Sequence, residues 1–66
     1  MAALVTTVTT INDTDFNDAP ITFKQTTSTI GGKDTGIITS SPSSDTDQQA
    51  IDAHVAQLTA LDYIFD

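Results

Sequence analysis

The stretch SSDTDQQAIDAHVAQLTALDYIFD occupies residues 43–66, and its pattern decides the fold that we expect. Apolar side chains recur there at steps of three and four residues, which places them on one stripe of a helix with 3.6 residues per turn. The members of this stripe are Ile51, Val55, Leu58, Leu61 and Phe65. The pattern predicts one amphipathic helix over residues 45–65.

The start of this helix carries its own signal. Thr46 is followed three residues later by Gln49, which is the spacing of a capping box, and Ser44 with Asp47 is a second register for the same motif. Asp45 and Asp47 both lie near the positive end of the helix dipole, where carboxylates are stabilising by about 0.3–1 kcal/mol.

The other side of the helix is lined by small residues, namely Ala53, Ala56 and Ala60. A free surface helix usually carries charged residues there, so the helix is expected to be contacted on two sides. The alternative is that alanine, the best helix former, simply decorates an exposed face.

The preceding residues predict strands. Ile21 and Phe23 alternate with polar neighbours, which is typical of a half-buried strand, here over residues 21–30. The second half of this segment is Thr and Ser, so we expect an edge strand or a strand that pairs with a partner chain. Three glycines within residues 31–36 predict a turn, which would complete a hairpin region over residues 21–39. The partial resemblance of this turn to a phosphate-binding loop lacks the rest of that motif.

The remaining segments complete the expected order. Residues 1–11 are rich in Val and Thr and predict either a strand or an extended arm, residues 12–20 an Asx-rich loop, and residues 40–44 a polar hinge. The whole chain is therefore expected to be a single small α+β domain over residues 1–66. It would contain an antiparallel β-ribbon of two or three short strands followed by one long C-terminal amphipathic helix.

One loop has a partial metal-binding pattern. Asp13, Asp15 and Asn17 match the first ligand positions of a calcium loop, but Asp18 stands where that loop has Gly, and Lys24 where it has Glu. A connector rich in Asx turns is the favoured interpretation, with calcium binding left as the alternative. No other cofactor is expected.

No catalytic constellation stands out. His54 is the one histidine, and it lies near the edge of the apolar stripe, so we expect it to be partly buried or to contact a partner. The acidic pair Asp45 with Asp47 is explained by its place at the positive end of the helix dipole, and the pair Asp62 with Asp66 is merely tolerated near the negative end, so neither pair needs a catalytic role. The sequence therefore predicts a protein that is not an enzyme.

Charge and size restrict the partners. The 66 residues include nine Asp, two Lys and no Cys, giving a formal net charge of -7. This excludes a basic nucleic-acid footprint, and no run approaches the roughly 20 apolar residues of a membrane span. Chains of this length bury only about 60% of their unfolded surface, so association with other proteins is the expected compensation.

The expected function is that of a structural subunit in a larger assembly, most plausibly a bacteriophage virion accessory, decoration or cement protein. The alternative is a small acidic inhibitor or nucleic-acid mimic that binds a basic protein partner, with the cytoplasm as the alternative location to the virion. The helix residues expected to contact partners are Ile51, Val55, Leu58, Leu61, Phe65, Ala53, Ala56 and Ala60. The strand residues are Val5, Val8, Ile21 and Phe23.

Overall fold

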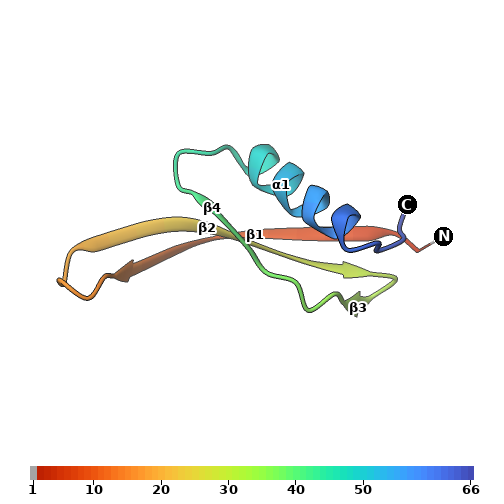
Figure 1. Cartoon of the computed structure of the whole chain (residues 1–66), viewed down its shortest axis with the longest axis horizontal. Helices are drawn as coiled ribbons and strands as arrows, with labels where there is room; N and C mark the ends of the chain where they lie inside the picture. Colours follow the sequence, from red (N-terminus) through yellow and green to blue (C-terminus); the bar gives the residue numbers. More distant parts are fainter. Residues whose placement is uncertain (1) are drawn as a thin grey trace.

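A computed structural model describes residues 2–66, and it shows an antiparallel sheet with one helix on one of its sides (Figure 1). The elements in chain order are β1 (Leu4–Thr14), β2 (Pro20–Ile30), β3 (Lys33–Asp34), β4 (Thr39–Pro42) and α1 (Asp47–Ala60). The predicted class, α+β with a β-ribbon followed by a C-terminal helix, is confirmed.

The longest feature is the hairpin formed by β1 and β2. Each strand has 11 residues, and the pairing runs from Leu4 opposite Ile30 to Thr14 opposite Pro20 without a bulge. Residues 1–11 were predicted as a strand or an arm, and residues 4–11 are strand. The loop predicted over residues 12–20 is shorter than expected, because residues 12–14 continue the ladder.

β2 is the central strand. β1 pairs along one of its sides, and β3 and β4 pair along the other. Gly31 and Gly32 have φ values of 60° and 80°, the left-handed conformation that a tight two-residue turn requires. Two predictions about the segment after this turn are wrong. Residues 37 and 38, predicted as part of the hairpin region, lie outside any strand, and residues 40–42 of the predicted hinge belong to β4.

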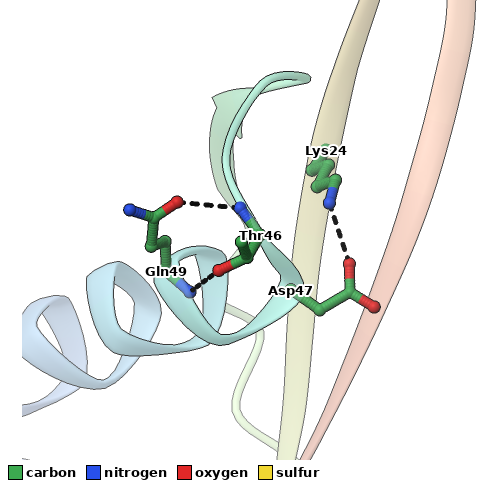
Figure 2. A network of polar contacts seen from close by, with 4 residues as sticks. All are labelled: Lys24, Thr46, Asp47 and Gln49. Carbon is green, nitrogen blue, oxygen red and sulfur yellow. Dashed lines mark hydrogen bonds and ion pairs between the residues drawn. The ribbon is translucent and has the colours of Figure 1, made fainter.

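The predicted capping box at the start of α1 is present. The Gln49 backbone N–H donates to Thr46 Oγ1 at 3.2 Å, and the Thr46 N–H donates to Gln49 Oε1 at 2.8 Å (Figure 2). Beside it, Lys24 of β2 forms an ion pair with Asp47 at 2.9 Å, which ties the first turn of the helix to the sheet.

The helix is shorter than the predicted 45–65 and ends at Ala60. The chain turns there because Asp62 adopts a left-handed φ of 63°, and the Tyr63 N–H donates to the Leu58 carbonyl. This is the Schellman arrangement, which satisfies the last carbonyls of a helix. The remaining residues return to the start of β1, where the Asp66 N–H donates to the Ala2 carbonyl at 2.9 Å, so the two ends of the chain lie together (Figure 1).

The buried side of the helix differs from the predicted stripe. Ala50, His54 and Leu58 are buried, whereas Leu61 is 52% exposed. Ile51, Val55 and Phe65 are half-buried, and Ala53, Ala56 and Ala60 are exposed. The helix is thus rotated relative to the apolar stripe, because a polar residue, His54, occupies the centre of its contact with the sheet.

The sheet side of the core is polar as well. Thr26, Ser28 and Ser41 are buried, and among residues 2–66 the only buried apolar side chains are Ala50 and Leu58. The polar second half of β2 was expected to form an edge or to pair with a partner chain. That expectation is wrong, because these residues lie in the central strand, where Thr26 and Ser28 are buried beneath the helix and Ser28 is hydrogen-bonded to His54.

We expect Thr46→Ala to lower the free energy of unfolding by about 1 kcal/mol, since it removes the acceptor for the Gln49 N–H. Urea denaturation followed by circular dichroism measures the change. Ser44→Ala is the matched control, because Ser44 represents the other predicted register and is exposed. Equal losses from the two substitutions would argue against the capping box as the stabilising contact.

Candidate functional site

A buried histidine joins the helix to two strands. His54 of α1 is fully excluded from solvent, and its Nε2 lies 2.6 Å from Ser28 Oγ of β2. Its Nδ1 lies 2.8 Å from Thr39 Oγ1 of β4. The expectation of a partly buried or partner-contacting histidine is therefore wrong, because both ring nitrogens bond within the chain.

The neighbouring hydrogen bonds fix the direction of this network. Thr39 Oγ1 donates to Gln57 Oε1 at 2.9 Å, so its hydroxyl proton is already used and it accepts from His54 Nδ1–H. In the neutral imidazole Nε2 is then the acceptor, and Ser28 donates to it. Ser28 Oγ also lies 2.9 Å from Thr35 Oγ1, whose hydroxyl donates to the Ser28 carbonyl at 3.3 Å. With one ring nitrogen donating and the other accepting, the arrangement fits neutral His54.

The Ser28–His54 pair has the spacing of a nucleophile and its general base, but its surroundings differ from such a site. The other ring nitrogen faces Thr39, whereas an orienting partner in a catalytic triad is a carboxylate. Ser28 is 3% exposed, and within the described residues 2–66 no pocket leads to it. The geometry is that of a packing contact between helix and sheet.

Burial lowers the pKa of His54 below its ordinary value of 6.5, because the charged imidazolium loses its hydration. The folded chain consequently binds this proton less readily than the unfolded chain.

The hairpin loop over residues 15–19 uses its acidic groups locally. Asp15 Oδ1 accepts from the backbone N–H groups of Asn17 and Ala19, at 2.8 and 3.0 Å, and Asp13 Oδ1 accepts from the Thr14 N–H at 2.8 Å. These are Asx-turn contacts, as the favoured interpretation of the loop predicted. Within residues 2–66 no three acidic or histidine side chains converge on a point that would hold a metal ion.

The same loop exposes an aromatic side chain that the sequence analysis did not select. Phe16 is 95% exposed at the far end of the hairpin, which extends away from α1 (Figure 1). Nothing in the local pattern marks this residue, since a lone Phe in a polar loop has no periodicity.

One face of the sheet lacks a covering layer in the described part of the chain. The helix covers the face that carries Thr26, Ser28 and Lys24, and alternation places every second residue on the other face. In the β1–β2 hairpin this uncovered face comprises Val5, Thr7, Thr9, Ile11, Asp13, Ile21, Phe23, Gln25, Thr27 and Thr29.

The predicted partner-contact residues are thus divided between surfaces. Val5, Ile21 and Phe23 share the uncovered face, and Val5 is 60% exposed. Val8 lies on the helix side of the sheet and is half-buried, while Leu58 is fully buried in the core. The exposed alanines of α1 form a third surface. No single surface collects all the residues chosen from the sequence.

Comparison of the chain with models of known protein families, with curated proteins and with solved structures gives no match. No helix within residues 2–66 is long and apolar enough to cross a membrane.

We expect the stability of the chain to fall as the pH is lowered from about 7.5 to about 5.5. A histidine with a lowered pKa contributes its full stability above the unfolded value of 6.5, and this contribution is lost as the pH falls through the folded pKa. Urea midpoints across this range measure the effect. His54→Gln removes the titrating group, so an unchanged pH slope in that variant would contradict the assignment to His54.

Thr26→Val should stabilise the chain by about 1–2 kcal/mol, because Thr26 Oγ1 is buried without a hydrogen-bond partner among residues 2–66. Thr27→Val, one residue away on the uncovered face, is the control and should change the free energy of unfolding by less than about 0.5 kcal/mol. Thermal melts of both variants give the comparison. A destabilised Thr26→Val protein would mean that the hydroxyl has a partner in solution.

Proposed function

We propose that this chain is a non-enzymatic structural subunit that neighbouring protein chains complete. The observation that carries the proposal is the β1–β2 hairpin, which α1 covers over part of one face and which is open on the other face and along the outer edge of β1. A sheet normally buries one face against another layer and protects its edges. Here protein partners would provide the missing cover.

The distribution of apolar side chains supports this role. Two apolar side chains are buried within residues 2–66, whereas a larger number of large apolar side chains are exposed. The exposed group comprises Val5, Phe16, Ile21, Ile38, Leu61 and Ile64. Phe16, at the end of the projecting hairpin, is suited to insert into a pocket of a neighbouring subunit, because an aromatic anchor contributes strongly to an interface.

A virion shell or tail is the kind of assembly that we propose, with the chain acting as a bacteriophage accessory, decoration or cement protein. Three features support this form of the proposal: the small size of the chain, its Thr-rich strands, and a buried His54–Ser28 pair whose geometry is that of a packing contact. The virion is the corresponding proposed location, with the cytoplasm as the alternative.

The alternative function, an acidic inhibitor that mimics nucleic acid, has less support. Such a mimic presents carboxylates in an array. In this chain the Asp residues are divided between the far end of the β1–β2 hairpin, β3, the middle of the helix and the two helix ends. Asp47 is also paired with Lys24, which reduces the charge available to a partner.

We expect the purified chain to have low stability and a melting temperature that rises with protein concentration, since association would cover its open face. Light scattering after size-exclusion chromatography and thermal melts at several concentrations measure both properties. A stable monomer with a sharp, concentration-independent melt would contradict the structural-subunit proposal.

Val5→Thr should weaken this association, while Ile38→Thr should leave it unchanged. The two side chains have nearly equal exposure, 60% and 58%, but only Val5 belongs to the β1–β2 hairpin. The pair therefore separates a specific contribution of the β1–β2 hairpin from a general effect of surface hydrophobicity. Equal effects of the two substitutions would show that the hairpin is not the contact.

A further inference from the structure

The two edges of the sheet are protected to different degrees. One edge consists of β3 and β4, which have two and four residues, carry Lys33 and Asp34, and end at Pro42. Short, charged and proline-ended strands resist pairing with other chains. The other edge is β1, which has 11 residues, no proline and no charged side chain before Asp13. It is an unprotected edge.

The hydrogen bonds around β2 show which groups of β1 face outward. The Gly31 N–H donates to the Ala3 carbonyl, and on the other side of β2 the Thr35 N–H donates to the Ser28 carbonyl. The N–H and C=O of one residue in an antiparallel strand point to the same side, and the side alternates along the strand. The residues with outward backbone groups are therefore Leu4, Thr6, Val8, Thr10 and Asn12.

Both ends of this outward series are closed by the chain itself. At one end the Asp66 N–H donates to the Ala2 carbonyl, and at the other the Thr14 N–H is bonded by its neighbour, Asp13 Oδ1. Within the described residues 2–66, no hydrogen bond closes the outward groups between these ends. The free edge is thus the uncharged run of residues 4–12, and Val8 is its midpoint.

We infer that a second copy of this chain pairs its β1 antiparallel to this edge, with the two-fold axis at Val8. The inference rests on the proposed function and specifies one of its contacts. In this register Leu4 lies opposite Asn12, Thr6 opposite Thr10, and Val8 opposite Val8, so each outward group in the run meets a partner. On the uncovered face, the exposed Val5 lies opposite Ile11 of the second copy.

Charge does not oppose a second copy along the paired run itself. Each copy carries a net charge of -7, but no charged residue lies in the run over residues 4–12. Asp residues of the two copies approach only at the ends of the paired region, where Asp13 of one copy is near Asp66 of the other. Salt screens this repulsion, so added salt should tighten the dimer.

The pairing also stops at two copies. An antiparallel contact about a two-fold axis uses the β1 edge of both copies. The remaining outer edges are the short β3 and β4, which resist further addition. The expected product is a dimer with one continuous sheet and both helices on the same face, and not a fibre.

Disulfide cross-linking tests the register, because the chain contains no cysteine of its own. In Val8→Cys the two sulfurs would come from a hydrogen-bonded antiparallel pair with Cα atoms about 5.5 Å apart, within the range of a disulfide. We expect oxidation to give a covalent dimer.

Val5→Cys is the control. It should form no disulfide-linked dimer on oxidation, although residue 5 is well exposed, because residue 11 of the second copy lies opposite it. Mixing the Val5→Cys and Ile11→Cys proteins should then give a mixed disulfide. Failure of Val8→Cys to cross-link, or equal cross-linking by Val5→Cys alone, would overturn the register.

Thr10→Pro tests the edge itself. The Thr10 N–H points outward, so proline there removes a donor for the second copy while the β1–β2 ladder keeps its bonds. We expect light scattering from about 1 μM to about 1 mM to show association of the wild-type chain, strengthened by salt, and a folded monomer for Thr10→Pro. Thr10→Val keeps the N–H and should associate like the wild type.

Several outcomes separate this inference from the proposed function. Association that persists in Thr10→Pro, without a Val8→Cys cross-link, would overturn β1 pairing and leave the structural-subunit proposal standing. A weakly stable wild-type monomer at every concentration would do the same, with a different protein as the partner. If Thr10→Pro does not fold, the cross-linking pattern decides.

Discussion

The hydrogen bonds of His54 are the contact on which the rest of this structure depends. They join α1 to β2 through Ser28 and to β4 through Thr39. Among residues 2–66 only two apolar side chains, Ala50 and Leu58, are fully buried, so polar contacts contribute much of what sets the position of the helix. Because a hydrogen bond needs its two atoms within a narrow range of distance and angle, the network specifies one register between the helix and the strands, whereas an apolar contact of this size would tolerate sliding.

The open face of the sheet follows from the same arrangement. Side chains alternate along a strand, so the helix that binds Ser28 can contact only every second residue of β2. With 14 residues in the helix, the chain has no second layer among residues 2–66 for the other face. The polar core and the uncovered face are therefore two consequences of placing one helix on a four-stranded sheet.

The sequence was sufficient for features decided by near neighbours. The capping box of Thr46 and Gln49 depends on residues within a few positions, and it was predicted. The glycine turn is equally local: it was predicted over residues 31–36 and is found at residues 31–32, with β3 inside the predicted range. The buried side of the helix was not predicted, because the apolar stripe gave no weight to His54. Its partner Ser28 is 26 residues away, and no periodic pattern reports such a pairing. A histidine at the step of four between Ala50 and Leu58 was the available signal.

The composition of β1 limits the apolar surface that an open edge exposes. Threonine has the branched side chain that favours strands, but its hydroxyl keeps the surface polar. A Thr-rich edge therefore offers main-chain hydrogen bonds without a large apolar patch. Main-chain hydrogen bonds do not distinguish one sequence from another. The selectivity of such an edge must therefore come from where its free hydrogen-bonding groups begin and end along the strand. In β1 these limits are the contacts at Ala2 and Thr14, which leave a free run of one length with Val8 at its centre.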